Sequence, residues 1–315
     1  MLKRLLRKRT SPAETAATAA KLAMQTSTVV AHRLEEAIGF FAGRSNPHHY
    51  TATAYLGDNT VLALLHGRIL IYLDTRGTDL APHVMMFGIW EPNYTQLFQR
   101  LIRPGDVVFD IGAHLGVYAL LGCVATGTGG QVHAFEPNPR FAALLTRSLA
   151  VNGFRGFAKV HNLAVGAAEG QSELRFNWEF AGGGHLATPR ARVAPGVETV
   201  PCRVAAIDDL FPDPAFTVDV IKMDVEGTET QAVRGMAGLL ARSPRVRILF
   251  EFAPGLQKAH GSSAAELIGL LEALGFAFWT VGADSGIAPV AATDLASRTG
   301  DIINILAARS DPFAA

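Results

Sequence analysis

Apolar runs and helical segments alternate along residues 104–281, and this pattern sets the predicted fold. Five runs of β-branched, aromatic and other apolar residues cover 107–111, 131–135, 218–223, 246–250 and 276–281. Segments with helical spacing lie between them, at 117–125, 139–152, 226–236 and 264–274. Because apolar strands that alternate with helices are typical of a parallel sheet covered on both faces, we predict an α/β fold. Residues 301–307 form one more apolar run, which we predict to be the last strand.

The first hundred residues show a different pattern. The pair Ser11-Pro12 is typical of a helix start, and apolar residues at helical spacing extend from Leu22 to Phe41. Two short β-rich runs, 61–65 and 68–73, predict a hairpin, and 91–103 is again helical. We therefore predict an N-terminal helical and β-hairpin extension over residues 1–103 and a main domain over residues 104–315.

Residues 170–204 interrupt the alternation of strands and helices. Two candidate strands, 172–176 and 198–204, flank a Gly-rich segment, 181–185, that ends at His185. Because clustered glycines between periodic segments are typical of loops, we predict a loop here that can close over the site as a lid.

Composition narrows the classes of function. Of the 315 residues, 49% are hydrophobic and 18% are charged, which suffices for a full core and excludes a disordered chain. The 28 Lys and Arg residues balance 28 Asp and Glu residues, so a nucleic-acid binder, which is usually basic, is not expected. Cys123 and Cys202 are far apart, which excludes a disulfide framework and a cysteine zinc site. The sequence has no run of about eighteen apolar residues, so we expect no stable membrane insertion and a cytoplasmic protein.

A glycine-containing turn after the first strand of the main domain is the strongest sign of function. The strand ends at Asp110, and the turn from Gly112 to Gly116 opens a helix. The next strand ends at Glu136, where a carboxylate can accept hydrogen bonds from both hydroxyls of a ribose. Glycines let a ligand approach the backbone, and open α/β sheets bind their ligands at this edge.

Two nucleotide cofactors use such a turn, and Asp110 distinguishes them. A dinucleotide places its pyrophosphate at the helix N-terminus, where a carboxylate would repel it. It also favours a middle glycine where this chain has His114. S-adenosylmethionine has no phosphate and carries a cationic amino group. We therefore predict S-adenosylmethionine as the cofactor, and a nicotinamide-dependent oxidoreductase is the alternative.

These residues, with several further motifs, resemble the FkbM-type methyltransferases, a group of the Rossmann-like S-adenosylmethionine-dependent enzymes. The shared motifs are Pro104-Gly105-Asp106, the turn 110–116, Phe135-Glu136-Pro137-Asn138-Pro139, Ala164-Val165-Gly166, Ile207-Asp208-Asp209-Leu210, the run 221–229, and Glu251. The resemblance implies a mostly parallel seven-stranded sheet with helices on both faces and an antiparallel last strand. It also implies methylation of a hydroxyl of a sugar, glycan or secondary metabolite. The family usually has Asn where this chain has His114, and both residues tolerate positive φ, so we expect the turn to be kept.

The predicted cofactor residues lie mainly at the ends of the strands predicted at 107–111 and 131–135 and of a further strand that ends before Asn162. They are Asp110, Gly112, Ala113, His114, Gly116, Glu136, Pro137, Asn162, Ala164 and Asp224. By position, Asp110 and the backbone around Gly112 hold the amino-acid part of the cofactor, and Glu136 holds the ribose. Asn162 and Ala164 are expected near the adenine.

Transfer to an alcohol also requires a base, because the hydroxyl must lose its proton. The predicted catalytic residues are Asp224, Glu226, Glu251 and His114. Asp224 and Glu251 directly follow the strands predicted at 218–223 and 246–250, and Glu226 and Glu229 are expected on one face of the helix after Asp224. Structural alternatives exist: Asp224 can cap that helix, Glu226 can complement its dipole, and Glu251 can hold an Arg.

The same three carboxylates, Asp224, Glu226 and Glu251, are oxygen ligands that suit Mg²⁺. Nothing in their spacing requires a metal, so we predict none. The expected partner is a small-molecule or glycan hydroxyl substrate, and the N-terminal part can form a homodimer contact. A protein that binds the cofactor without turnover is the second alternative.

Overall fold

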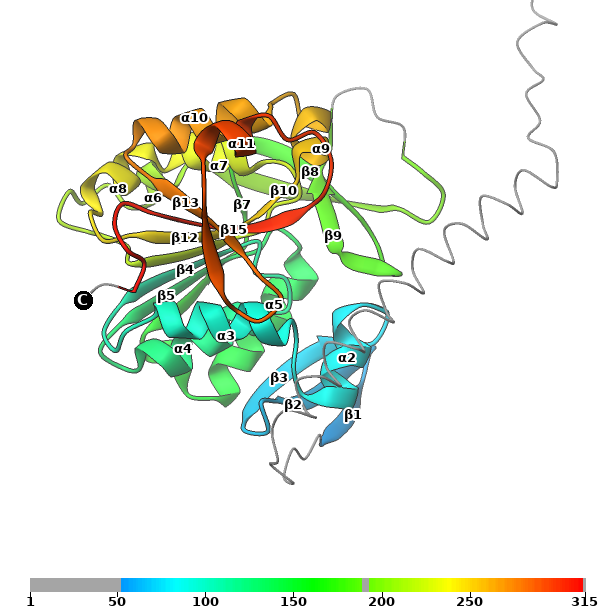
Figure 1. Ribbon diagram of the computed structural model, residues 1–315. Coiled ribbons are helices and arrows are strands. Elements are labelled where there is room, and N and C mark those ends of the chain that lie inside the picture. Colours follow the sequence, from blue (N-terminus) through cyan, green and yellow to red (C-terminus); the bar gives the residue numbers. More distant parts are fainter. Residues whose placement is uncertain (1–51, 189–192, 314–315) are drawn as a thin grey trace, which may run out of the picture. The chain divides into compact units, whose positions relative to one another are not determined.

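The computed structural model describes residues 52–188 and 193–313 (Figure 1). The helix predicted between Ser11 and Phe41, and with it the predicted homodimer contact, lie outside the described residues. Among the described helices, none is long and apolar enough to cross a membrane.

A mixed sheet of eight strands forms the centre of the main domain, in the order β14-β13-β15-β12-β11-β4-β5-β6. Its strands are β4 (Val107–Ile111), β5 (Gln131–Phe135), β6 (Ala158–His161), β11 (Val220–Met223), β12 (Arg247–Phe252), β13 (Ala277–Val281), β14 (Ile287–Val290) and β15 (Ile303–Ala308). Strands β4, β5, β6, β11 and β12 pair in parallel, and the last strand, β15, is antiparallel to β12 and β13. The predicted α/β class is confirmed.

The prediction of seven strands was wrong, because β14 adds an eighth. It pairs antiparallel with β13, across a turn in which the N–H of Gly282 donates to the carbonyl of Gly286. Its four residues are half-exposed or exposed and include Pro289, so they form no apolar run in the sequence. Proline is tolerated here because β14 is the edge strand of the sheet.

Helices cover both faces of this sheet (Figure 1). One face carries α3 (Pro92–Leu101), α4 (Val117–Thr126) and α5 (Pro139–Val151), and the other carries α7 (Glu229–Gly235), α8 (Ala237–Arg242) and α10 (Ala264–Ala273). Shorter helices are α6 (Ile207–Leu210), α9 (Pro254–Ala259), α11 (Ala292–Ala296) and the 3₁₀ turn Phe154–Gly156. Each face has its own buried apolar cluster, one with Leu97, Leu120 and Leu145, the other with Val233, Leu240 and Leu267. These clusters hold the strand ends rigidly in place.

The helix expected over residues 226–236 begins only at Glu229, so the placement of Glu226 on a helix face was wrong. Glu226 has φ +52° and Gly227 has φ +99°. An α-helix cannot contain such left-handed residues, so the chain makes a loop after β11. Glu229 is fully buried and its Oε1 accepts the N–H of Gly227 at 3.1 Å, which stabilises this loop.

A second, three-stranded sheet contains β1 (Thr53–Gly57), β2 (Thr60–Leu65) and β3 (Ile69–Asp74), followed by α2 (Leu80–Phe87). The predicted hairpin over 61–73 is confirmed as β2 and β3. Side chains of α5 hold this sheet: Asn152 exchanges hydrogen bonds with the backbone of Leu70, and the Ser148 hydroxyl accepts the N–H of Tyr72. The apolar side chains of β2 and β3 belong to the same buried cluster as those of α4 and α5.

A third sheet has the order β7-β10-β8-β9, with β7 (Ala164–Val165), β8 (Gly170–Asn177), β9 (Phe180–Leu186) and β10 (Glu198–Ala205). The expectation that 181–185 is a loop was wrong, because these glycines belong to β9. The N–H of Gly182 donates to Asp79 Oδ2 at 2.6 Å, and the Thr78 hydroxyl donates to the carbonyl of Glu179 at 2.6 Å. A Cβ at Gly183 would lie 2.4 Å from the ring of the exposed Phe180, so the glycine lets that ring lie against the strand.

Candidate active site

A cleft of about 560 Å³, partly open to solvent, lies at the carboxyl ends of β4 and β5. Its lining residues are Gly112, His114, Phe135, Glu136, Pro137, Phe141, Leu163, Ala164, Val165, Leu174, Ala181, Gly182, Gly184, Leu186, Asp224, Val225 and Thr228. Six residues predicted to bind the cofactor are among them. Within the described lining, Asp110, Ala113, Gly116 and Asn162 are absent.

The turn after β4 adopts a backbone that requires its glycines. Gly112 and Gly116 have φ +78° and +90°. A Cβ at Gly112 would lie 1.8 Å from the carbonyl oxygen of Asp224, and one at Gly116 would lie 2.0 Å from Leu145 Cδ1. His114 has φ +50°, a left-handed value that His tolerates better than most residues. The turn therefore brings the backbone close to β11 on one side and to α5 on the other.

Asp110 lies at the end of β4, fully buried behind this turn. The ammonium of Lys222 lies 4.0 Å from its Oδ1. Burial raises the pKa of Asp110 to about 6, and the positive charge of Lys222 opposes that rise. Lys222 also lies 3.3 Å from Asp224 Oδ2, so one ammonium serves two carboxylates at the ends of neighbouring strands.

Glu136 follows β5 and has both carboxylate oxygens placed by backbone donors. Its Oε1 accepts the N–H of Asn138 at 2.7 Å, and its Oε2 accepts the N–H of His114 at 2.6 Å. Burial raises its pKa to about 7, although these two hydrogen bonds lower it. Asn162 donates from Nδ2 to the carbonyls of Glu136 and Pro137, so it holds the strand end that carries Glu136.

One wall of the cleft was missed by the sequence reasoning. It consists of β8 and β9 side chains, namely Leu174, Ala181, Gly182, Gly184 and Leu186. Asp79, before α2, fastens this wall through its hydrogen bond to Gly182. The only signal of this wall in the sequence was the run of glycines in β9. Such a run is compatible with a loop, but also with a strand that another backbone segment approaches closely.

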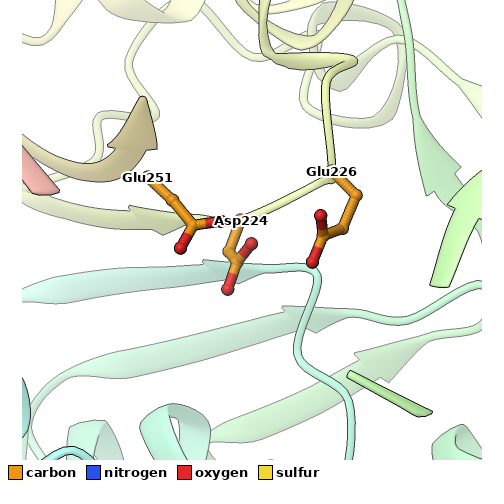
Figure 2. A group of neighbouring side chains, drawn as sticks. All are labelled: Asp224, Glu226 and Glu251. Atoms are coloured by element: carbon orange, nitrogen blue, oxygen red, sulfur yellow. The ribbon is translucent and has the colours of Figure 1, made fainter. Parts of the chain in front are cut away.

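Three carboxylates converge beside the cleft: Asp224 at the end of β11, Glu226 in the next loop, and Glu251 in β12. One oxygen of each lies within 4.8 Å of the others, and Figure 2 shows their carboxylates together above the end of β4. Burial and the charge of Asp224 raise the pKa of Glu226 to about 9 and that of Glu251 to about 8. The cluster can therefore take up protons near neutral pH, and its oxygen ligands are also of the kind that hold a divalent cation.

Two tyrosines, one from α3 and one from α4, pack together beside Lys222, and the sequence reasoning missed them too. The Tyr118 hydroxyl donates to Glu91 Oε2 at 2.6 Å, and the Lys222 ammonium lies 4.8 Å above the Tyr118 ring. Tyr94 packs edge-to-face against Tyr118, with ring centroids 5.8 Å apart. The two tyrosines are separated in sequence from the β-strand carboxylates by more than a hundred residues, so only the fold brings them together.

His114 and His185, which ends the Gly-rich segment, differ in their surroundings. His114 lines the cleft, its ring stands edge-on to Phe141 at 4.5 Å, and burial lowers its pKa. It is therefore a neutral imidazole at neutral pH. His185 lies beside His260, with ring centroids 6.0 Å apart, and its Nδ1 is 3.3 Å from the carbonyl of Gly183.

The fold and the cleft define an α/β protein with a ligand site at the carboxyl ends of its strands, and the comparisons with known proteins give its class. The family model of the methyltransferase FkbM domain matches residues 110–278, more than half of the chain. The protein therefore belongs to the FkbM methyltransferase family. The resemblance predicted from the motifs is confirmed, and the oxidoreductase alternative has no support.

Two curated relatives are each 28% identical to this chain. The 31-O-demethyl-FK506 methyltransferase FkbM of Streptomyces tacrolimicus matches over 202 residues, 56% of this chain and 74% of the relative. The hexuronic acid methyltransferase AglP of Haloferax volcanii matches over 152 residues, 48% of this chain and 58% of the relative. The crystal structure of methyltransferase FkbM from Methylobacillus flagellatus has a TM-score of 0.39 and 15% identity, over 75% of this chain and 62% of that one. A likeness this remote adds nothing to the assignment.

Proposed function

We propose that the protein transfers the methyl group of S-adenosylmethionine to a hydroxyl of a sugar, glycan or secondary metabolite. The observation that carries this proposal is the position of Asp224, which both lines the cleft and belongs to the carboxylate cluster. Asp224 therefore connects the cleft proposed for the cofactor with the carboxylates that can accept a proton. The names of the curated relatives, one for a demethylated FK506 and one for a hexuronic acid, are consistent with such acceptors.

The residues of the cleft fit S-adenosylmethionine, which supplies an already activated methyl group when bound. Glu136 presents two oxygens held by backbone N–H groups, an arrangement suited to the two hydroxyls of a ribose. Gly112 lines the cleft and has no side chain, so a ligand can approach its backbone. Asp224 lines the cleft and supplies negative charge for a cationic amino group or sulfonium, while Asp110 and Lys222 lie buried next to it.

The remaining chemistry falls to the chain itself. Alignment of the acceptor oxygen with the methyl carbon supplies much of the rate, because both reactants are held in place. The acceptor hydroxyl must also lose its proton, and Glu251 is the proton acceptor in this proposal. Its pKa of about 8 lies close to neutral pH, where a general base with such a pKa is effective. Asp224 and Glu226 hold the acceptor beside it.

Calorimetric titration tests the cofactor, with S-adenosylhomocysteine and NADH added separately to metal-free protein. We expect micromolar binding of the first and none of the second, and the reverse result would remove the proposal. An acceptor screen with methyl-labelled S-adenosylmethionine then tests turnover on hydroxyl compounds. Tight cofactor binding without transfer to any hydroxyl would instead support a protein that binds the cofactor without turnover.

A further inference from the structure

Lys222 is a buried cation that lies behind the cleft and reaches two residues that line it. Its ammonium lies 3.4 Å from the carbonyl oxygen of Gly112 and 3.3 Å from Asp224 Oδ2. Gly112 and Asp224 line the cleft, whereas Lys222 is absent from its described lining. Burial of an ammonium costs free energy unless the charge is paired and hydrogen-bonded. The contacts of Lys222 therefore indicate what the buried charge does.

The register of two strands fixes the place of this ammonium. Lys222 of β11 is paired directly with Asp110 of β4, so the two side chains lie on one face of the sheet. Asp224 follows two residues later, and its N–H continues the ladder by donating to the carbonyl of Ile111 at 3.0 Å. Because side chains alternate between the faces of a strand, Lys222 and Asp224 share a face. The ring of Tyr118 lies 4.8 Å from the ammonium, which leaves the ammonium little freedom to move.

The carboxylate of Asp224 depends on Lys222 for its orientation. Among the described residues, Lys222 alone gives this carboxylate a hydrogen bond, and the other oxygen, Oδ1, is buried with no partner. The Asp224 side chain is 36% exposed, so without that bond it has room to adopt other rotamers. Lys222 thus holds Asp224 in one orientation beside the cleft.

Asp110 lies on the same ammonium but does not reach the cleft. It is fully buried and is absent from the described lining. Its Oδ1 lies 4.0 Å from the ammonium of Lys222. A buried carboxylate attracts a neighbouring ammonium strongly, because solvent screens the pair little. Asp110 is therefore placed to anchor Lys222 and not to touch a ligand in the cleft.

We propose that Lys222 is a positioning residue for the cofactor, which holds the Asp224 carboxylate and the turn at Gly112 in place, and that Asp110 acts on the cofactor only through Lys222. The proposal rests on the proposed function, because it concerns the cleft assigned there to S-adenosylmethionine. It changes the role of Asp110, which the sequence motif predicts to hold the amino-acid part of the cofactor. The charge of Lys222 by itself repels the cationic groups of that cofactor, so positioning and charge have opposite effects on affinity.

Calorimetric titration with S-adenosylhomocysteine measures which effect is larger. Lys222→Met keeps a long side chain and removes the charge. If the ammonium positions Asp224, binding should weaken about tenfold, which is the value of roughly one hydrogen bond to a charged group. If the ammonium acts by charge alone, its removal should tighten binding. Tighter or unchanged binding would overturn the proposal. Lys159→Met, at an exposed position of β6, is the matched control and should leave the affinity unchanged.

A double-mutant cycle separates an indirect role of Asp110 from direct contact with the cofactor. Asp110→Asn should weaken binding about threefold in the wild-type background and should have no further effect in the Lys222→Met background, because its action passes through the missing ammonium. Direct contact predicts the same loss in both backgrounds, so additive losses would refute the indirect role.

Stability separates positioning from a merely structural role. Lys222→Met should destabilise the protein, because it leaves Asp110 buried without its cation. The double variant Asp110→Asn/Lys222→Met removes both charges, so its free energy of unfolding should recover while its affinity stays low. Recovery of affinity together with stability would make Lys222 a structural residue only. If Lys222→Met alone does not fold, the double variant is compared with Asp110→Asn: weaker binding supports positioning, and tighter binding contradicts it.

Failure of the proposed function has a different signature, namely no binding of S-adenosylhomocysteine to the wild-type protein, and Lys222 then has no cofactor to position. Wild-type binding with additive losses, or with tighter binding after removal of the ammonium, refutes the role of Lys222 alone.

Discussion

At the scale of single residues, the site depends on carboxylates whose surroundings oppose their ionisation. Glu251 is the clearest case, because burial, Asp224 and Glu91 all raise its pKa, while Lys222 lowers it. A glutamate with an ordinary pKa would be ionised but weakly basic at neutral pH. The fold thus makes a stronger base from the same side chain, and the pH dependence of turnover reports the effect.

The rate of methyl transfer should therefore rise with pH through about 8, because Glu251 accepts a proton only when ionised. Glu251→Gln should lower kcat by about 10²-fold or more and remove this rise. The measurement is a pH profile of kcat/KM, with Glu272→Gln on exposed α10 as the control. A variant that keeps both the rate and the profile would exclude Glu251 as the base.

Gly112 is a residue at which conformation and contact both exclude a side chain. Gly112→Ala should lower the free energy of unfolding by more than about 2 kcal/mol, because its Cβ would overlap the carbonyl oxygen of Asp224 at 1.8 Å and its φ is +78°. Cofactor affinity should fall as well, since the turn must move.

Gly255→Ala is the matched control for that substitution. Gly255 lies in α9, its Cβ would meet nothing within 4 Å, and its φ is not in the left-handed region. We expect Gly255→Ala to be neutral or stabilising by up to about 1 kcal/mol. Chemical denaturation of both variants measures the difference, and equal effects at the two positions would contradict the account of the turn.

At the scale of elements, β9 is the part of the site whose conformation departs most from its local sequence. Its glycines favour a loop, yet its pairing with β8 and its attachment to Asp79 make it a wall of the cleft. The attachment is a single charge-assisted hydrogen bond to the N–H of Gly182, at 2.6 Å. The order of this strand should depend on that bond.

Asp79→Ala is expected to loosen β9 and to weaken binding of S-adenosylhomocysteine by about tenfold, the value of one charge-assisted hydrogen bond. Global stability should change little, because the main clusters of apolar side chains are untouched. Hydrogen exchange at 180–186 measures the loosening directly. Unchanged exchange in this strand, together with unchanged affinity, would show that β8 alone holds the wall.

At the scale of the whole molecule, the described residues before 104 share one buried apolar cluster with α4 and α5. The predicted division of the chain at residue 103 stays a prediction, and cooperativity of unfolding tests it. Asn152 joins the small sheet to α5 through two hydrogen bonds with Leu70, at 3.0 and 2.6 Å. A shared cluster predicts that both parts unfold together.

Asn152→Ala should therefore destabilise the protein by about 2 kcal/mol, since it leaves the backbone of Leu70 unpaired in a partly buried place. The unfolding transition should remain single, with coincident curves from circular dichroism and from tryptophan fluorescence. Separate transitions in the wild type would support the division at residue 103 as two folding units.

The elements that could be predicted from sequence are those stabilised by their own pattern. Strands β4 and β5 and helix α4 coincide with the predicted ranges to within one residue, because each is a short apolar run or an apolar helix bounded by glycine. Edge strand β14 and the start of α7 were missed or misplaced. Strand β14 forms because it pairs with β13. Helix α7 starts late because Glu226 and Gly227 adopt left-handed backbone conformations.

The sequence by itself determined the class of fold, the glycine turn with Asp110 and Glu136, and the family, because these depend on local pattern and short motifs. Only the tertiary structure decided what surrounds Asp224. The carboxylates of Glu226 and Glu251 and the ammonium of Lys222 come from separate elements. The shifted pKa values of the two glutamates arise from burial and mutual charge. Such effects depend on distance in space, which spacing along the chain does not contain.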